Sequence, residues 1–354
     1  MQQVITIGNK KVGPGHPVFI IAELGINHKG DMSVAKEMMR EAKRVGADAV
    51  KLQSFITEDF VGDKELMYTY KSQGKEVTES QFSMFKRYEL TRSMQKELFA
   101  YAKKIGIILF STPQDNSFKT VDFLCSSEIN MPAIKVGSDD LSNLALMEHY
   151  AKKKKPMIIS TGMATIDEVH DAVETVKKAG NEKLIVLKCT SLYPTPPEKA
   201  NLLQIKTLQS AFDVMVGYSD HTVGATAAVV ATILGAVVIE KHFTLSKEMA
   251  GPDHWFSADP VEMKQLVDQV REAEKILGIP QLILSKEEAV MKRDCRRSVM
   301  AMQEISKGTV ITKEMVDVKR PGFGLPPKYL PFIVGRTAKK DIKKDQVLSL
   351  SDLK

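Results

Sequence analysis

The chain has few cysteines, no long apolar run and no strong excess of charge, and each of these absences excludes a class of protein. Its three cysteines are odd in number and match no disulfide or metal-binding spacing, so we expect a reduced, cytoplasmic protein. The first residues show neither the basic segment nor the apolar core of a signal peptide. No apolar run approaches the roughly 20 residues that span a bilayer, so no membrane association is expected.

The positive charge of the chain is mild, at +6 over 354 residues. Domains that bind nucleic acids concentrate basic side chains in a stripe. The one basic run here, Lys152 to Lys155, directly precedes an expected strand and is typical of a solvated helix end. The charge therefore favours a small anionic partner and predicts no nucleic-acid binding.

Apolar runs typical of buried strands alternate regularly with amphipathic helical stretches. Most of these strands recur about every 25 to 30 residues, the length of one βα unit. Eight parallel βα units close into a (β/α)8 TIM barrel. A doubly wound open sheet is the alternative, but its Gly-rich phosphate turn is not matched at residues 25–30. The expected strands are residues 19–24, 49–55, 107–111, 133–136, 157–160, 184–189, 214–218 and 237–243.

Two further segments flank or interrupt these units. Residues 4–18 predict a short hairpin, and residues 58–89 form an insertion after the second strand. After residue 280 the pattern changes to short β-like segments separated by Gly and Pro. We therefore expect a barrel domain at 1–280, a linker at 281–295 and a small β-rich domain at 296–354, which is too small to bury much surface alone.

Polar and charged side chains lie at the same end of several expected barrel strands. Glu23, Lys51, Gln53 and Lys135 interrupt apolar runs that should otherwise be buried. Any one lysine could be a structural partner of a glutamate, but several buried charges around one mouth point to the catalytic end of a barrel. Two lysines and nearby hydroxyl groups predict a phosphate site for a small phosphorylated anion. These hydroxyl groups belong to Ser111, Thr112, Ser138, Ser160, Thr161 and Ser219.

Two histidines, His221 and His242, end the seventh and eighth expected strands. Adjacent parallel strands lie about 5 Å apart, so the two rings could share one ion and leave positions open for water and substrate oxygen. Asp220, Glu240 and Asp253 are candidate further partners of that ion. The alternative is that each histidine is only a satisfied polar group.

Motifs spread over nearly the whole chain resemble one family. They are IAELGINH at 21–28, KLQ at 51–53, KVGS at 135–138, STGM at 160–163, CTSLYP at 189–194, GYSDH at 217–221, EKHFT at 240–244 and GPDH at 251–254. Together they resemble the bacterial sialic acid (nonulosonic acid) synthases. KRPG at 319–322 and GR at 335–336 resemble the antifreeze-like (SAF) domain of that family.

The resemblance implies condensation of phosphoenolpyruvate with an N-acetylmannosamine-type sugar, with C–O cleavage and release of phosphate. It implies that His221 and His242 bind a divalent ion that polarises the sugar aldehyde, usually Mn²⁺, with Mg²⁺ or Co²⁺ as alternatives. Lys51 and Lys135 would stabilise the departing phosphate. The residues that would hold phosphoenolpyruvate are Lys51, Thr112, Lys135, Ser138, Ser160 and Ser219.

The same resemblance assigns roles around the sugar. Glu23 would lie near the reacting carbons, and Gln53, Tyr193 and Asp253 would contact the sugar. Arg320 of a partner subunit would reach the N-acyl group, which implies a domain-swapped homodimer.

Three positions depart from the family pattern. Asp140 stands where some relatives have Glu, which leaves its role in orienting the attacking water open. Arg296 and Ser191 differ from at least one branch of the family at positions that bear on the sugar. N-acetylmannosamine, a diacetamido-trideoxyhexose leading to legionaminic or pseudaminic acid, and a 6-phosphate sugar therefore all remain open.

Two rival functions follow from the residues alone. A Schiff-base aldolase would use Lys51 or Lys135 as its nucleophile. A carbohydrate-binding protein would use the C-terminal domain for recognition and the barrel as a scaffold. The cluster of buried charges argues against a scaffold, because a scaffold does not need them.

Overall fold

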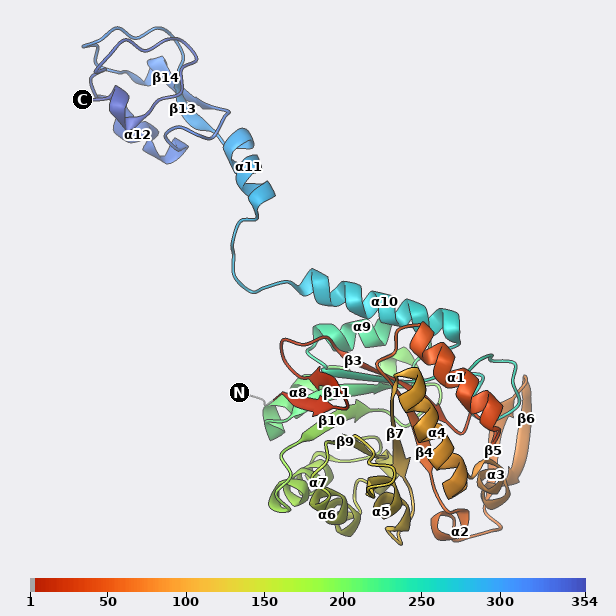
Figure 1. The fold of residues 1–354 in the computed structure, drawn as a ribbon. Helices are drawn as coiled ribbons and strands as arrows, with labels where there is room; N and C mark the ends of the chain where they lie inside the picture. The colour runs from red at the N-terminus through yellow and green to blue at the C-terminus, as the bar shows by residue number, and fades with distance from the viewer. Residues whose placement is uncertain (1–3) are drawn as a thin grey trace. The chain divides into compact units, whose positions relative to one another are not determined.

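The computed structural model describes residues 4–354 and divides into two compact units. The first unit ends at Gly278 and the second comprises Ile279–Lys354 (Figure 1). Residues 1–3, which belong to the predicted barrel domain and to the stretch inspected for a signal peptide, lie outside the described residues. Across the described chain, no helix combines the length and the apolar character needed to cross a bilayer.

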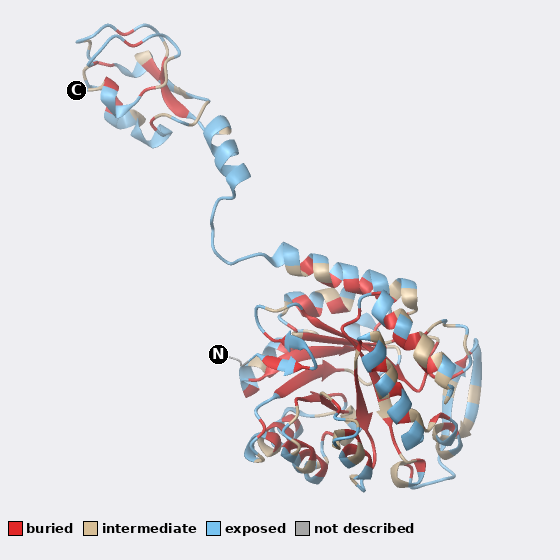
Figure 2. Ribbon diagram, viewed as in Figure 1, coloured by how far each residue is buried: buried red, intermediate tan, exposed pale blue. Residues whose placement is uncertain are grey.

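The first unit contains a closed barrel of eight parallel strands, which confirms the predicted fold. Nearly all strand residues are buried (Figure 2), as expected where side chains fill the barrel interior on one face and pack against helices on the other. The barrel strands are β3 (Phe19–Gly25), β4 (Ala49–Ser54), β7 (Ile108–Pro113), β8 (Ile134–Val136), β9 (Met157–Ser160), β10 (Leu184–Cys189), β11 (Met215–Asp220) and β12 (Val238–His242).

Helices surround the barrel and begin and end at recognisable signals. The Asp31 carboxylate caps the first helix by accepting from Ser33 N at 2.7 Å and Val34 N at 3.2 Å. Gly106 ends the helix before β7 in the left-handed conformation, with φ of 69°. The helices are α1 (Met32–Arg44), α4 (Arg92–Ile105), α5 (Lys119–Cys125), α6 (Leu144–Lys152), α7 (Ile166–Lys178), α8 (Gln204–Phe212), α9 (Thr226–Ile233) and α10 (Pro260–Leu277).

Two hairpins accompany the barrel. The first, β1 (Ile5–Ile7) and β2 (Lys10–Val12), lies within the predicted N-terminal hairpin. The second lies in the insertion, between a short helix α2 (Thr57–Phe60) and a helix α3 (Gln81–Tyr88), and consists of β5 and β6. The bounds of these last two strands are Met67–Ser72 and Lys75–Ser80.

The insertion hairpin is fastened to the loop that follows β12. Ser72 Oγ accepts from Gly251 N at 3.1 Å, and Gln73 Nε2 donates to Glu248 O at 2.9 Å. Lys71 Nζ lies 5.1 Å from the centre of the Trp255 ring, within cation–π range. The hairpin therefore has a defined position beside the carboxyl ends of the barrel strands.

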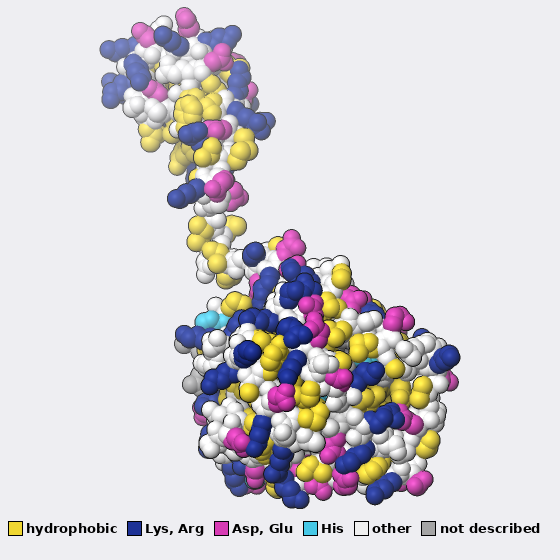
Figure 3. All heavy atoms as spheres, turned by 45° about the vertical axis from the view of Figure 1, so that its right-hand side comes forward, with side chains coloured by type: hydrophobic (Ala, Val, Ile, Leu, Met, Phe, Trp, Pro, Cys, Tyr) yellow, Lys and Arg dark blue, Asp and Glu magenta, His cyan; other side chains and the backbone are white. Residues whose placement is uncertain are grey.

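The second unit has its own small apolar core, which includes Val299, Ile305 and Leu348. It contains α11 (Lys286–Cys295), β13 (Ser298–Ala301), β14 (Val316–Lys319) and the short helix α12 (Leu330–Ile333). Apolar side chains follow one another along the segment between α10 and α11, where Leu282 is fully exposed (Figure 3). Over the face of the barrel in the same view, basic side chains are interspersed with acidic and apolar ones.

Candidate active site

A cavity of about 410 Å³ lies at the carboxyl ends of the barrel strands, and we call it the mouth cavity. Parallel strands in a closed barrel point the same way, so side chains at their carboxyl ends converge there. The predicted site residues that line it are Glu23, Lys51, Gln53, Thr112, Lys135, Ser138, Ser160, Tyr193, Ser219, His221, His242 and Asp253. The lining does not include four other predicted barrel residues, which are Ser111, Asp140, Thr161 and Asp220.

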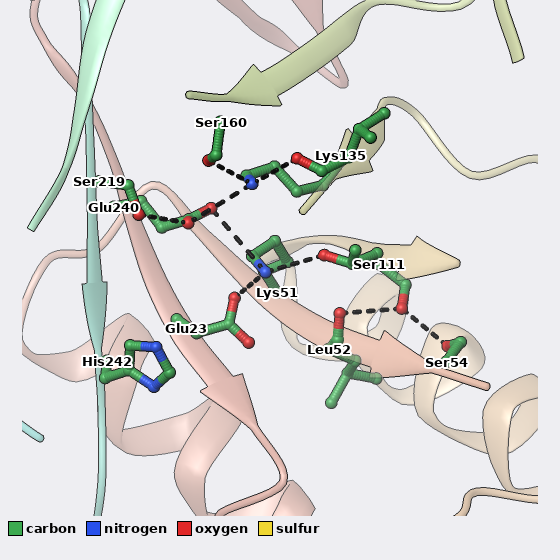
Figure 4. A network of polar contacts seen from close by, with 12 residues as sticks. Glu23, Lys51, Leu52, Ser54, Ser111, Lys135, Ser160, Ser219, Glu240 and His242 are labelled. Carbon is green, nitrogen blue, oxygen red and sulfur yellow. Dashed lines mark hydrogen bonds and ion pairs between the residues drawn. The ribbon is translucent and has the colours of Figure 1, made fainter. Parts of the chain in front are cut away.

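Two lysines and two glutamates form an alternating charge network at the floor of the mouth cavity (Figure 4). Lys51 Nζ is ion-paired with Glu23 and donates to Thr112 Oγ1 at 2.9 Å. Lys135 Nζ lies 3.8 Å from Glu240 Oε1, and Lys51 Nζ lies 3.9 Å from Glu240 Oε2. All four side chains are buried, so each charge depends on its neighbours for stabilisation.

The pKa values of these groups follow from burial and from the neighbouring charges. Burial raises the pKa of Glu23, and the positive charge of Lys51 only partly offsets it. Burial also acts to raise the pKa of Glu240, but Lys135 and Lys51 outweigh it and lower that pKa. Burial acts to lower the pKa of Lys51, but Glu23 and Glu240 outweigh it and raise that pKa. For Lys135, burial prevails and lowers the pKa. Glu23 and Glu240 therefore favour the cationic form of Lys51 beside the cavity.

Hydroxyl and backbone groups extend this network into a cradle. Lys135 Nζ donates to Ser160 Oγ at 2.7 Å, and Gly162 N donates to Ser138 Oγ at 2.9 Å. A side chain at residue 162 would place its Cβ 2.7 Å from Ser138 Oγ and would collide with Ser191 Oγ, so only glycine fits. The Ser191 hydroxyl is buried without a hydrogen-bond partner in the described part of the chain. An anion with several oxygens would satisfy these donors.

The two histidines face each other on the opposite side of the cavity, with ring centres 5.3 Å apart. His221 Nδ1 lies 2.9 Å from Thr190 O and must donate to it, which leaves Nε2 as the free nitrogen of the neutral ring. His242 Nδ1 is buried without a hydrogen-bond partner among residues 4–354. Burial lowers the pKa of His242 well below its ordinary value, and the nearby His221 adds to this effect.

This histidine pair fits a divalent metal ion that takes two ligands from the protein. Neutral imidazoles are common metal ligands, and an unpartnered buried nitrogen is otherwise costly. Within residues 4–354, no group of three or more His, Cys, Asp or Glu side chains is arranged to hold an ion. A bound ion would therefore take its remaining ligands from water or substrate, which is typical of catalytic rather than structural sites.

Asp253 lies beside this pair, with its Oδ2 3.8 Å from His242 Nδ1. Burial, together with the charge of Glu23, raises the pKa of Asp253 to about 7. Two hydrogen bonds hold the loop that carries Asp253. Asn27 Nδ2 donates to Ser257 Oγ at 3.0 Å, and that hydroxyl donates to Asp253 O at 2.6 Å. A carboxyl group near its pKa at neutral pH can give or accept a proton.

The outer part of the mouth cavity is largely apolar. Its wall comes from the residue after β3 and from the insertion, and a cluster of aromatic rings supports it, with Phe55, Phe60 and Phe85 centred 5.0–5.6 Å apart. The residues of this wall are Ile26, Phe60, Tyr68, Gln81, Met84 and Phe85, and we call them the apolar wall.

Two of the acidic residues singled out from the sequence do not face the cavity. Asp140 lies outside the lining, whereas its neighbour Asp139 lines the cavity and accepts from Gln114 Nε2 at 3.2 Å. Asp220 is buried on the other face of β11, where its carboxylate pairs with Lys241 Nζ at 2.9 Å. Asp220 is therefore not placed to contact an ion between the histidines directly, and only an indirect role beside them is left for it.

Glu240, a predicted candidate partner of the ion, lies two residues before His242, and strand alternation places both on one face. Other lining residues were not predicted as site residues. Cys189, Gln114 and Asp139 also line the cavity, but loop residues such as the last two carry no comparable signal. Arg320 follows β14 in the second unit, where it is exposed.

Comparisons with known proteins agree with this arrangement. The NeuB family model matches residues 38–281, and the SAF domain model matches residues 296–354. An uncharacterized protein of Methanocaldococcus jannaschii is 46% identical over 99% of this chain and 98% of its own. The N,N'-diacetyllegionaminic acid synthase of Legionella pneumophila is 40% identical over 93% of this chain and 92% of its own. The crystal structure of N-acetylneuraminic acid (sialic acid) synthetase from Leptospira borgpetersenii superposes with a TM-score of 0.73 at 34% identity, covering 82% of this chain and 95% of that one.

Proposed function

Because this chain belongs to the NeuB family and is a phosphoenolpyruvate-dependent nonulosonic acid synthase, we propose that its mouth cavity joins phosphoenolpyruvate to the open-chain aldehyde of an N-acylated amino sugar. One observation supports this above all: the cavity combines a cationic, hydroxyl-rich cradle with a facing pair of imidazoles. The cradle suits a phosphate and the imidazoles suit an ion that activates a carbonyl.

Phosphoenolpyruvate would occupy the cradle. Lys51 and Lys135 would face its negative charge, while the hydroxyls of Thr112 and Ser160, which now bond the two ammonium groups, can turn to phosphate or carboxylate oxygens. Glu240 lies between the two lysines, so the anion must compete with it for both. The same lysines would stabilise the phosphate as it leaves by C–O cleavage.

A divalent ion, which we propose to be Mn²⁺ with Mg²⁺ or Co²⁺ as alternatives, would be held by His221 and His242. When bound, it would supply Lewis-acid polarisation of the aldehyde oxygen. Asp253, whose pKa is raised to about 7, would hold a proton close to that oxygen, and Glu23, which is paired with Lys51, would lie near the reacting carbons. Asp139 is the carboxylate at the cavity edge that would accept a proton from the attacking water, in place of Asp140.

For the sugar, we propose a diacetamido-trideoxyhexose, as used by legionaminic acid synthases, in preference to N-acetylmannosamine. The apolar wall suits a sugar that carries a methyl group and a second acetamido group instead of hydroxyls. Lys51 and Lys135 are the only lysine or arginine side chains of the described barrel unit that line the cavity. A 6-phosphate sugar would therefore bring a second phosphate without a cation from the barrel.

We also propose a domain-swapped homodimer in which Arg320 of a second copy meets the N-acyl group of the sugar. The exposed position of Arg320 at the end of β14 supports this proposal, and Arg296 and Ser191 are further candidates for setting sugar selectivity. Removal of residues 296–354 should then raise the KM for the sugar far more than the KM for phosphoenolpyruvate. An unchanged sugar KM would refute the swapped arrangement.

The test of the function is phosphate release from phosphoenolpyruvate with a panel of sugars, with and without a chelator. We expect release with the diacetamido-trideoxyhexose, weaker release with N-acetylmannosamine, and loss of both on chelation. A substrate adduct trapped by borohydride would instead indicate a Schiff-base aldolase. Sugar binding without any phosphate release would indicate a carbohydrate-binding protein.

A further inference from the structure

One buried ion pair, Asp220–Lys241, lies directly behind the two histidines and outside the mouth cavity. Its side chains are 0% and 3% exposed, and neither lines the cavity. The reaction proposed above does not use it. We propose that this pair is a positioning device that aligns His221 and His242 for a shared divalent ion; this inference rests on the proposed function.

The register of the two strands makes this role specific. In the parallel pair β11–β12, Ser219 lies opposite Glu240, and Asp220 lies opposite Lys241. Successive side chains on a strand point to opposite faces, so the ion pair is flanked on both sides by pairs that face the cavity. Toward the strand starts, Ser219 Oγ donates to Glu240 Oε1 at 3.0 Å. Toward the strand ends come the two histidines.

The ion pair also holds the backbone on both sides of His221. Asp220 Oδ1 accepts from Thr222 N and from Thr222 Oγ1, each at 2.8 Å. Lys241 Nζ donates to Thr222 O as well as to Asp220 Oδ2. The residues before and after His221 are therefore both tied to Lys241, which itself directly precedes His242.

With the backbone held in this way, the ring of His221 needs only one further contact to be oriented. Thr190 O provides it from the end of β10 by accepting from Nδ1 at 2.9 Å. His242 has no such contact at Nδ1 within the described chain, so its position depends more strongly on the end of β12. Partners that orient metal ligands commonly change metal affinity 10- to 100-fold when they are removed.

A second ion pair of the barrel unit, whose carboxylate is buried, provides a control. Asp48 Oδ2 lies 2.8 Å from Arg271 and accepts from Ile20 N at 2.9 Å. Asp48 lies at the amino ends of the strands, before β4 begins, whereas His221 follows β11 and His242 is the last residue of β12. Its removal should lower stability without moving the histidines.

The test measures Mn²⁺ binding to the full-length protein. Binding is detected as a decrease in the electron paramagnetic resonance signal of free Mn²⁺. In the double variant Asp220→Asn/Lys241→Met, both charges are removed together, so no lone buried charge is left. We expect its Kd for Mn²⁺ to rise about 10- to 100-fold. Its Kd for phosphoenolpyruvate without metal should stay within about twofold, because the cradle shares no partner with the pair.

Three further variants separate positioning from general destabilisation. Lys241→Arg keeps the charge and should retain most of the Mn²⁺ affinity. Thr222→Val keeps both charges and removes one hydrogen bond, so the Kd should rise about two- to tenfold. Asp48→Asn/Arg271→Met should lower the melting temperature and leave the Mn²⁺ Kd unchanged.

Each outcome decides the matter. A folded Asp220→Asn/Lys241→Met protein with wild-type Mn²⁺ affinity would overturn the inference. If that variant does not fold, a wild-type Kd in Thr222→Val would overturn it instead. An equal loss of affinity in the Asp48 control would also do so. If the wild-type protein leaves the free Mn²⁺ signal unchanged, the metal assignment itself is wrong, which is a distinguishable result.

Discussion

Replacement of Lys135 by Met would test the phosphate cradle most directly. Lys135 is buried, donates to Ser160 Oγ at 2.7 Å and to Val136 O at 2.9 Å, and lines the mouth cavity. The substitution keeps most of the side-chain volume and removes one of the two cations that would face phosphoenolpyruvate. We therefore expect a loss of binding rather than a change in shape.

The size of the loss follows from the charge removed. Two unit charges about 4 Å apart at an effective dielectric constant near 20 attract by about 4 kcal/mol. Since about 1.4 kcal/mol corresponds to a tenfold change, the Kd for phosphoenolpyruvate should rise by about 10²- to 10³-fold. Glu240, which lies 3.8 Å from Lys135, keeps Lys51 as its partner. The free energy of unfolding should therefore fall by only about 1–3 kcal/mol.

Lys188 offers a closely matched control on β10, which is separated from β8 by β9. It is also buried, and its Nζ donates to Cys189 O at 2.8 Å and to Thr190 Oγ1 at 2.7 Å. Burial lowers the pKa of both lysines, but Lys188 does not line the mouth cavity. Lys188→Met should therefore lower stability and leave phosphoenolpyruvate binding unchanged.

Isothermal titration calorimetry with phosphoenolpyruvate would give the two Kd values, and thermal melts followed by circular dichroism would give the stabilities. Wild-type affinity in Lys135→Met would refute the cradle. An equal loss in both variants would show that burial of any lysine at this end of the barrel, rather than contact with the anion, sets the affinity.

Three other predictions follow from the site. His242→Ala should reduce turnover to background while the thermal melt persists, because the metal pair is incomplete; full activity in chelator would contradict this. Burial and two neighbouring carboxylates raise the pKa of Asp140 from 3.8 to about 7, so the stability that its protonation contributes is fully present below about pH 4 and is lost as the pH rises through 7. In urea titrations at a series of pH values, Asp140→Asn should reduce the fall in the free energy of unfolding between pH 4 and pH 7 by about 1–2 kcal/mol and should preserve turnover. An unchanged fall would contradict the assignment. Gly162→Ala should crowd the two serine hydroxyls that face it and weaken phosphoenolpyruvate binding about 5- to 100-fold, and wild-type affinity would show that the cradle can open.

The barrel could be predicted from the sequence because its strands are mostly apolar runs that recur at the spacing of one βα unit. The helix α5 could not, since it has only seven residues and begins after Phe118, which caps no backbone group with its side chain. The hairpin in the insertion was equally hidden. Its strands are largely exposed, so they lack the apolar alternation that marks a half-buried strand.

The same physical reasons explain which site residues could be found. Lys51, Lys135 and His242 lie on strands, where alternation and direction together fix the face and the end. That alternation also places Asp220 on the face opposite to His221, a consequence available from sequence alone. The choice between Asp139 and Asp140 depends on a loop after β8, where no period applies.

The division of the mouth cavity between scaffold and insertion has a consequence for how such enzymes diversify. The cradle and the histidines belong to barrel strands and their ends, whereas most of the apolar wall, including Phe60, Tyr68 and Phe85, belongs to one continuous stretch between β4 and α4. In the proposed function, the groups that would handle phosphoenolpyruvate and the apolar wall that would favour one sugar therefore lie in separable parts of the chain. A segment between these two elements could be exchanged among relatives as a cassette, changing the accepted sugar while every group that handles phosphoenolpyruvate stays in place.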